Sequence, residues 1–417
     1  MKRSIFYLIL SLSLLSAEAQ EWTVYTTANS LLPNNHIQAI ATQENGIKWV
    51  GTPSGLARFD GQVWNNYNTG NAGLPSSNIT AIATGKQNTV WIGTDKGLVH
   101  YDGTHWTVYT TQNSALRRNT ISKLTWDSNT ETLWVATEIG LVKYDGTNWV
   151  DLENSNPFFA DELILSIAID RNGLVWVGSF DHFQFQGRLW QFDGTAWKRT
   201  KLEDHELSSS FPTALVADEQ NILWLTIKGT MGGFLVSIKN DNWSILDKHS
   251  LPCLEGGIST VVLQGTQKWM GTGAGLLMYK ETPCRSYNTR NSGLPDDFVS
   301  SIAIDEKGNK WIGTISGGLA VYKDGPQQDN PLKAVLHIFP NPVNETASIS
   351  LQLPFTTTVV LELFNTSGQL LQTLYNRTLP AGRHTFTSRF FRLPKGLYYC
   401  KMRYSQTARV IATVVVQ

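Results

Sequence analysis

Cysteine, charge and long apolar runs are all scarce in this 417-residue sequence. Only 16% of the residues are charged and the formal net charge is zero, which excludes a highly charged disordered chain. After Gln20 no apolar run reaches the length of a membrane-spanning helix, so no transmembrane segment is expected in the mature chain. Gly (34), Trp (15) and Tyr (13) are plentiful instead, and this composition favours a turn-rich, all-β protein.

The few cysteines and histidines form no recognisable metal or redox motif. Cys253, Cys284 and Cys400 cannot all pair within one chain. A bridge between Cys253 and Cys284 is one alternative, but no sequence feature supports it, and buried free thiols are the favoured interpretation. The eight histidines lack the short spacings of metal sites, so no metal site and no cofactor are predicted.

Both ends of the chain differ from its main body. Lys2 and Arg3 precede an apolar stretch and a small-residue cleavage pattern, so residues 1–19 are predicted to be a secretory signal peptide. From Pro331 onward there are nine Lys and Arg residues but two acidic residues, which leaves the main body acidic. An acidic body argues against nucleic-acid binding, because phosphate groups require clustered Lys and Arg.

An internal repeat organises the main body. Its motif, Trp-x-Gly-Thr or a close variant, begins at Trp49, Trp91, Trp134, Trp176, Trp224, Trp269 and Trp311. A period in the forties fits one four-stranded blade, so the sequence predicts an all-β fold with a seven-bladed β-propeller over residues 20–325. These tryptophans are interpreted as structural blade residues, because an aromatic side chain buries about 150–250 Å².

The last copy of the repeat is incomplete. Each full copy reads as four short strands joined by hairpin turns, with the Trp strand of the first copy at Lys48–Thr52. In the last copy a polar linker, 326–335, follows where the outer strand should be. Residues 21–27 nearly duplicate the outer strand at 105–111. They are therefore predicted to supply the outer strand of blade 7, which would otherwise leave an unpaired edge.

The repeat also resembles a known family. The run Trp-[Val/Ile]-Gly-Thr-x-x-Gly-Leu-x-x-[Tyr/Phe]-Asp-Gly, at Trp49–Gly61 and Trp91–Gly103, resembles the propeller repeat of two-component regulators. In that family the repeat forms the periplasmic sensor of hybrid histidine kinases. No transmembrane helix, kinase or DNA-binding output follows here, so the resemblance implies the fold and not signal transduction.

The C-terminal segment, 336–417, resembles the type A sorting domain of the type IX secretion system, found in Bacteroidota. Ile338-Phe339-Pro340-Asn341-Pro342 looks like the start of that family, and Leu379-Pro380-Ala381-Gly382 follows its strand-turn pattern. The resemblance implies a small C-terminal β-sandwich that the type IX secretion machinery recognises. It also implies delivery through the periplasm to the cell surface or the medium.

Motifs of enzymes are missing from the sequence, which has no Gly-x-Ser-x-Gly, P-loop or EF-hand pattern. Asp170–Trp176 and Asp305–Trp311 resemble the Asp-box turns of sialidases with one extra residue, and such turns are structural. The leading hypothesis is an exported, non-enzymatic binding protein for a glycan or protein ligand. The alternatives are a secreted polysaccharide lyase or hydrolase with a propeller active site, and an adhesion component.

A ligand site is predicted on the face formed by the loops that precede each innermost strand and the loops that follow each Trp strand. Copies four and five are irregular on this face, and in copy four the usual two-residue turn is expanded between Ser179 and Leu189. The alternative is an ordinary solvated loop surface. The candidate ligand-binding residues are His36, Asp95, Lys96, Arg117, Arg118, Glu138, Asp181, His182 and Phe183.

Overall fold

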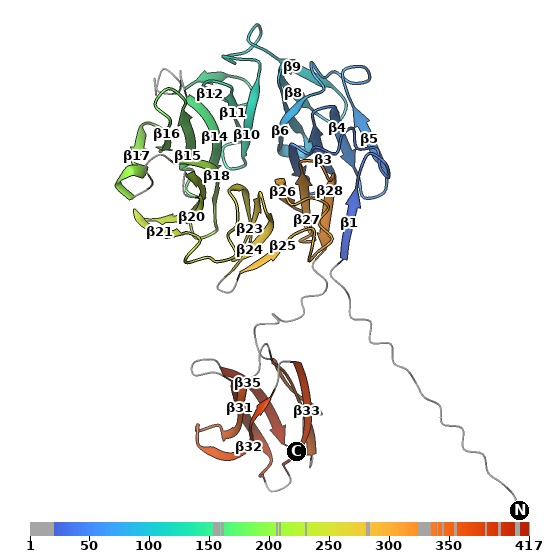
Figure 1. The fold of residues 1–417 in the computed structure, drawn as a ribbon, viewed down its shortest axis with the longest axis vertical. Coiled ribbons are helices and arrows are strands. Elements are labelled where there is room, and N and C mark those ends of the chain that lie inside the picture. Colours follow the sequence, from blue (N-terminus) through green and yellow to red (C-terminus); the bar gives the residue numbers. More distant parts are fainter. Residues whose placement is uncertain are drawn as a thin grey trace, which may run out of the picture. The chain divides into compact units, whose positions relative to one another are not determined.

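The computed structural model describes residues 21–152, 159, 162–205, 207, 210–229, 232–280, 284–323, 335–339, 341–343, 346–353, 357–379, 382–390, 393–404 and 409–416. The predicted signal peptide and residues 326–334 of the predicted linker lie outside this set. Two compact units are present, Ala19–Asp324 and a unit that includes Gly325–Gln417 (Figure 1). In the described parts of the chain, no helix is long and apolar enough to cross a membrane.

The first unit consists of seven four-stranded antiparallel sheets arranged as the blades of a ring (Figure 1). Blades 1 to 3 are β2 (Ala39–Thr42), β3 (Lys48–Thr52), β4 (Gly55–Phe59), β5 (Trp64–Tyr67); β6 (Ile79–Thr84), β7 (Val90–Thr94), β8 (Gly97–Tyr101), β9 (Trp106–Tyr109); and β10 (Ile121–Asp127), β11 (Thr132–Thr137), β12 (Leu141–Tyr144), β13 (Trp149–Asp151). Blades 4 and 5 are β14 (Glu162–Ile169), β15 (Val175–Asp181), β16 (Gln186–Phe192), β17 (Trp197–Thr200); and β18 (Phe211–Ala217), β19 (Leu223–Gly229), β20 (Gly232–Lys239), β21 (Asn242–Leu246). Blades 6 and 7 are β22 (Ile258–Gln264), β23 (Gln267–Thr272), β24 (Gly275–Tyr279), β25 (Arg285–Tyr287); and β26 (Val299–Ile304), β27 (Lys310–Thr314), β28 (Leu319–Lys323), β1 (Glu21–Tyr25). The 3-10 helices η1 (Lys86–Asn88) and η3 (Leu202–His205) lie between strands. The predicted seven-bladed β-propeller is confirmed.

Within a blade, the second strand is the most buried, and the innermost and outer strands are more exposed. The second strands β3, β7, β11 and β27 are buried at every residue, because neighbouring blades cover both of their faces. The innermost strand β6 alternates between buried and half-buried residues, and the outer strand β5 has no fully buried residue. The apolar core is therefore a series of clusters between neighbouring blades.

The repeat tryptophans lie in these clusters. Six of the seven are at most 8% exposed: Trp49, Trp91, Trp134, Trp176, Trp269 and Trp311. Trp224 is half-buried. The indole Nε1 of Trp311 donates a hydrogen bond to Asp305 and that of Trp224 to Asp218, both at 2.9 Å, so in these two blades the turn before the Trp strand satisfies the indole.

The ring is closed by strands from opposite ends of the propeller sequence. β1 pairs antiparallel with β28, which places Trp22 opposite Tyr322 with ring centroids 4.8 Å apart. On the inner side, the Ser300 hydroxyl of blade 7 donates to the Ile37 carbonyl of blade 1 at 2.6 Å. The first pairing thus completes blade 7, and the Ser300 bond joins blade 7 to blade 1.

Hydroxyl groups at one position of the innermost strands link neighbouring blades elsewhere too. Each lies at a β-bulge, where the residue leaves the ladder of its own sheet and its side chain reaches the next blade. The bonds are Thr80 Oγ1 to Ile121 O (2.5 Å), Thr213 Oγ1 to Ile258 O (2.9 Å) and Ser259 Oγ to Val299 O (2.6 Å). The bulge is therefore part of what holds the ring together.

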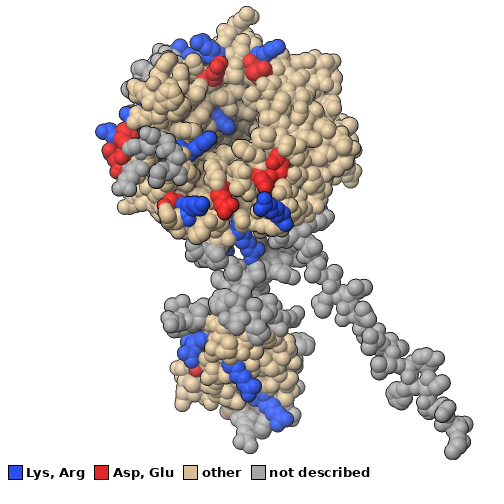
Figure 2. Space-filling view, in the orientation of Figure 1, with Lys and Arg blue, Asp and Glu red and all other residues tan. Residues whose placement is uncertain are grey.

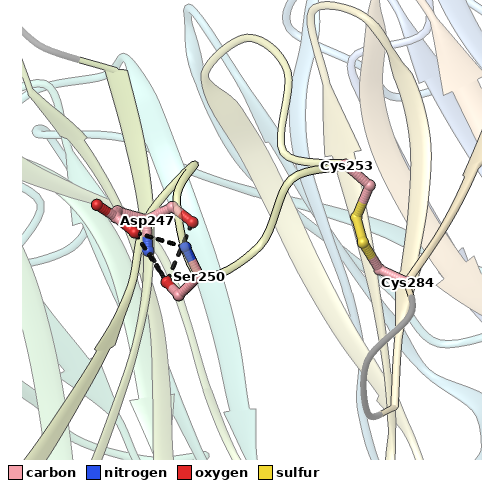
Figure 3. Close-up of a disulfide and its surroundings, with 4 residues drawn as sticks. All are labelled: Asp247, Ser250, Cys253 and Cys284. Carbon is pink, nitrogen blue, oxygen red and sulfur yellow. Dashed lines mark hydrogen bonds between the residues drawn. A yellow bond between two sulfur atoms is a disulfide. The ribbon is translucent and has the colours of Figure 1, made fainter.

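Blade 6 carries a disulfide between Cys253 and Cys284, whose Cα atoms are 6.2 Å apart (Figure 3). The interpretation of free thiols was wrong for this pair, whereas Cys400 is free and buried. Cys284 stands where other outer strands have a Trp, such as Trp106, so the cross-link occupies the place of an aromatic contact. Sequence spacing could not show this, because the two cysteines meet only through the packing of a loop on the blade.

The loop that contains Cys253 is ordered by its own polar groups. The Asp247 carboxylate accepts a hydrogen bond from the Ser250 backbone N–H at 2.9 Å, and the Ser250 hydroxyl accepts one from the Asp247 backbone N–H at 2.8 Å (Figure 3). Leu251 and Leu254 in the same loop are buried in the core between blades 5 and 6. The loop therefore reaches the disulfide in a defined conformation.

The second unit is a small β-sandwich, as predicted. One sheet has the order β29 (Val335–Phe339), β30 (Thr346–Leu353), β33 (Gly382–Arg389), and the other has the order β32 (Leu370–Leu379), β31 (Thr357–Asn365), β34 (Gly396–Arg403), β35 (Arg409–Val416). Both sheets contribute to one core, which includes Ile349 from the first and Leu361 from the second, each 0% exposed. Alternating side chains along β31 face this core.

Candidate functional site

The second and third strands of blade 4 extend beyond the length of the regular blades. In blade 1 the Thr of the repeat closes a short turn, because the Thr52 hydroxyl donates to the Gly55 carbonyl at 2.8 Å. In blade 4 the strands β15 and β16 remain paired as far as Asp181 and Gln186. The predicted expanded turn is therefore mostly strand, and only residues 182–185 form the turn.

A buried ion-pair network lies at the base of this hairpin. Arg188 is 5% exposed and pairs with Glu162 on β14 and with Asp181 on β15, the latter at 2.9 Å. Ser179, at the Thr position of the repeat, and Trp190 both donate to Glu162. One guanidinium thus neutralises two buried carboxylates on different strands, and this pairing holds the base of the hairpin in place.

The tip of the hairpin presents two aromatic rings to solvent. Phe183 is 72% and Phe185 is 75% exposed. The Asp181 carboxylate accepts hydrogen bonds from the backbone N–H groups of Phe183 and Gln184, both at 2.9 Å. Burial opposes ionisation of Asp181, but these two bonds and Arg188 outweigh it and lower its pKa. Phe185 has φ +53°, an uncommon value for a bulky residue, so the surrounding structure must hold the turn in place.

The hairpin packs against blade 5. The rings of Phe180 and Phe211 have centroids 5.0 Å apart, and the Gly187 N–H donates to the Ser210 carbonyl at 3.1 Å. A side chain at Gly187 would overlap the backbone of Phe211, so this close approach requires glycine. Strands β19 and β20 of blade 5 are also long, with pairing as far as Gly229 and Gly232, and residues 230–231 lie outside the described residues.

The remaining candidate residues lie on the same face but are spread over blades 1 to 3. His36 is half-buried before β2, Asp95 and Lys96 form the turn between β7 and β8, and Arg118 and Glu138 are exposed in loops of blade 3. Arg117 is exposed and its Nε donates to Asp151 at 2.7 Å. The structure therefore brings together Asp181, His182 and Phe183 in one hairpin and leaves the others as neighbours around the ring.

Two residues of the hairpin were missed among the sequence candidates. Phe185 is as exposed as Phe183, and Arg188 is the centre of the ion-pair network. The signal in the sequence was the phenylalanine-rich expansion itself, because Phe180, Phe183 and Phe185 interrupt an otherwise regular repeat. The role of Arg188 could not be read from this signal, since its partner Glu162 lies on another strand.

The geometry offers no accessible acid–base pair among the described residues of this hairpin. Glu162 is 1% and Asp181 is 7% exposed, and both are occupied by Arg188. A catalytic carboxylate must come within hydrogen-bond distance of its substrate, which this burial prevents. The His182 ring lies 4.0 Å from the Phe183 ring, and its buried Nδ1 has no hydrogen-bond partner within the described part of the chain. The residues that the structure describes also include no group of three or more His, Cys, Asp and Glu side chains that could hold a metal ion.

The centre of the ring is hollowed, and Lys and Arg atoms border the hollow (Figure 2). Lys123, on the innermost strand of blade 3, is in contact with solvent. The protein that surrounds it reduces its hydration, and this desolvation lowers its pKa. The corresponding residues of blades 1 and 2 are Ala39 and Ala81. Lys123 therefore makes the inner wall of blade 3 more polar than that of its neighbours.

Two families match parts of the chain. Residues 337–417 match the secretion system C-terminal sorting domain, and residues 73–96 match the two component regulator propeller. Both resemblances seen in the sequence are confirmed. The sorting domain directs export by the type IX secretion system to the cell surface or the medium. No curated protein matches the sequence.

Solved propeller structures share the fold at low identity. An extracellular domain assigned to the hybrid two component system BT3049 of B. thetaiotaomicron is 16% identical, with a TM-score of 0.61 over 95% of this chain and 57% of that chain. PorZ, a surface component of the type-IX secretion system of Porphyromonas gingivalis, is 15% identical, with a TM-score of 0.55 over 92% of this chain and 60% of that chain. Virginiamycin B lyase of Staphylococcus aureus is 10% identical, with a TM-score of 0.57 over 73% and 99%. This chain thus spans less than two thirds of the length of the first two structures, and these likenesses show the fold alone.

Proposed function

We propose that this exported chain is a non-enzymatic binding protein whose propeller engages its ligand through the hairpin of blade 4. The observation that carries the proposal is the pair of exposed rings of Phe183 and Phe185 on a turn anchored by buried ion pairs. Exposed aromatic side chains on a rigid support are typical of recognition surfaces, because they lose little conformational entropy on binding. In this proposal residues 1–19 are the signal peptide, 326–335 the linker, and 336–417 the address read by the secretion machinery.

A protein ligand fits this hairpin better than a glycan does. The two rings project from a turn whose backbone groups are already bound by Asp181, so the tip offers apolar surface and few free polar groups. A glycan needs hydrogen-bond partners beside an aromatic ring, and the candidate residues that could supply them, such as Lys96 and Arg118, lie in blades 2 and 3. Protein interfaces are enriched in Phe at their centres and need no such ring of polar partners.

The experiment compares the full-length chain with Phe183→Ser/Phe185→Ser. Each is immobilised and exposed to a surface-protein fraction of the native host, to a glycan array and to a panel of bacterial polysaccharides. We expect a host surface protein to be retained by the wild-type chain and at least tenfold less by the double variant. Leu31→Ser, at an exposed apolar residue on a loop of blade 1, is the matched control and should retain the partner.

Three outcomes would contradict the proposal. Equal retention by the double variant would show that the hairpin is not the contact. Binding of a glycan alone would show that the ligand class is wrong. Turnover of a polysaccharide would favour a secreted lyase or hydrolase instead.

A further inference from the structure

A cavity of about 440 Å³ lies on the opposite face of the propeller, where the turns between the first and second strands of blades 1, 2 and 3 meet. Its walls include Gln43, Lys86, Gln87, Asn88, Trp126 and Glu131. All of these residues belong to the described part of the chain, and none was a candidate in the sequence. The volume is in the range of small-ligand sites.

The cavity is associated with a departure from the repeat. In blade 1 the Gln43 side chain accepts a hydrogen bond from Trp49 Nε1 at 3.0 Å, and Asp218 and Asp305 cap the indoles of their blades in the same way. Blade 2 has Gly85 at this position, and Gly85 lines the cavity. A Cβ at Gly85 would lie 2.6 Å from the Thr89 hydroxyl, so Thr89 and not a cap residue packs beside the indole of blade 2. The turn of blade 2 therefore departs from the repeat where it borders the cavity.

Trp126 provides the aromatic wall. It lies at the end of β10 opposite Leu133, at the position occupied by Thr42 in blade 1 and by Thr84 in blade 2. The corresponding residues of the other four blades are Ile169, Ala217, Leu263 and Ile304. Trp126 is therefore the one aromatic residue at this position of the seven repeats, and it is half-buried rather than enclosed in the core.

The rim is polar and contains charges of both signs. Lys86 Nζ and Glu131 Oε1 are 2.6 Å apart, and their side chains are 56% and 54% exposed. Gln43, which also lines the cavity, is only 5% exposed, and its side-chain amide donates to the Asn88 carbonyl at 2.6 Å. This bond connects the turns of blades 1 and 2. The cavity is therefore lined by an exposed pair of charged groups and by a buried amide with a fixed orientation.

The turns at the rim have left-handed backbone conformations. Asn88 and Glu131 have φ values of +63° and +55°, and the corresponding residues of other blades, such as Gly46 and Asn221, also have positive φ. These values therefore belong to the turn of the repeat, and of the three only Gln87, with φ +54°, is an additional left-handed residue of blade 2.

We propose that this cavity binds one ring of a neutral saccharide. A sugar ring has an apolar C–H face that packs on an indole, and hydroxyl groups that both donate and accept hydrogen bonds. Lys86 donates and Glu131 accepts, and the exposed Glu44 also lines the cavity, so the lining disfavours an anion and offers both donors and acceptors to the hydroxyl groups of a neutral sugar. This site is independent of the hairpin of blade 4, since the two lie on opposite faces of the ring.

The test uses the full-length chain and saturation-transfer difference NMR with maltose, cellobiose and N,N′-diacetylchitobiose as probes. We expect transfer to the ring protons of at least one disaccharide, and at least a tenfold weaker affinity in Trp126→Leu. Lys86→Ala/Glu131→Ala removes two exposed side chains and should weaken binding about tenfold without affecting folding. Trp149→Leu, at another half-buried Trp of blade 3, and Phe183→Ser/Phe185→Ser should bind the probe as the wild type does.

The proposal fails if none of the three probes shows transfer. It also fails if the affinity for the probe is unchanged in Lys86→Ala/Glu131→Ala. This double variant tests the site even if Trp126→Leu does not fold. Equal loss in Trp149→Leu would overturn the assignment to Trp126, because the signal would then reflect a general effect on blade 3. Because the hairpin variant serves as a control, failure here leaves the proposed function intact.

Discussion

Blades 1 and 4 contain the same four-stranded unit but treat the turn after the Trp strand differently. In blade 1 the Thr52 hydroxyl bonds the Gly55 carbonyl and closes a short turn without burying any charge. In blade 4 the residue at that position, Ser179, donates to Glu162 instead, and the hairpin continues to a tip with exposed rings. The comparison teaches that a blade can depart from the repeat only where new partners satisfy the groups that the departure buries.

The largest effect is expected from removing the central charge of blade 4. Arg188→Met leaves Glu162 and Asp181 buried without their cation, and should lower the free energy of unfolding by about 3–5 kcal/mol, measured by urea denaturation. Arg171→Met is the control, because the side chains of Arg171 and its partner Glu219 are 64% and 70% exposed. Its effect should stay below about 1 kcal/mol. Equal effects of the two substitutions would show that the network does not hold the hairpin.

The disulfide of blade 6 provides the next largest effect. Cys253→Ala/Cys284→Ala should lower the free energy of unfolding by about 2–4 kcal/mol, because the cross-link no longer restricts the unfolded chain. Cys253→Gly/Cys284→Trp restores the pairing found where Gly73 lies beside Trp106, and should recover part of the loss. If the Gly/Trp variant is no more stable than the Ala variant, the cross-link does not replace an aromatic contact.

A smaller effect is expected from the Asp-Gly turns that the regular blades share with blade 4. The backbone N–H of Asn148 lowers the pKa of Asp145 to about 2, and that of Ala196 lowers the pKa of Asp193 to about 2. Because an unfolded Asp titrates near pH ~3.9, this stabilisation is complete above about pH 4 and is lost as the pH falls towards 2. Asp145→Asn/Asp193→Asn should therefore flatten the decrease in stability between pH 4 and 2.

The control for this prediction is Asp241→Asn, in the corresponding turn of blade 5. The free energy of unfolding is measured at several pH values for each protein. If the free energy of unfolding decreases equally between pH 4 and 2 in the double variant and the wild type, these turns do not contribute to the pH dependence.

The smallest effect on stability is expected at the tip itself. Phe183→Ser/Phe185→Ser should change the free energy of unfolding by no more than about 0.5 kcal/mol, since both rings are exposed. Phe180→Ser removes a half-buried ring that packs on Phe211 and should cost more. A large loss of stability in the double variant would mean that the rings belong to the packing of the blade and not to a binding surface.

Much of the fold could be predicted because the motif of one four-stranded blade occurs seven times in the sequence. The predicted strand Lys48–Thr52 coincides with β3, since a short run with Trp, Val and Thr between turn residues leaves few alternatives. The candidate site was less predictable. Asp181 and Phe183 were found through the irregular repeat, but the partner Glu162 and the cavity beside Trp126 depend on contacts between strands that lie far apart in the sequence.

The sequence by itself determined the blade, the number of blades and the sorting domain, because these follow from local periodicity and from short motifs. Only the tertiary structure decided that Arg188 is buried between two carboxylates, that Cys253 meets Cys284, and that the turns of blades 1 to 3 enclose a cavity. The physical reason is that charge pairing, cross-linking and cavity shape depend on distances between residues of different strands or blades. A pattern along one strand contains no information about those distances.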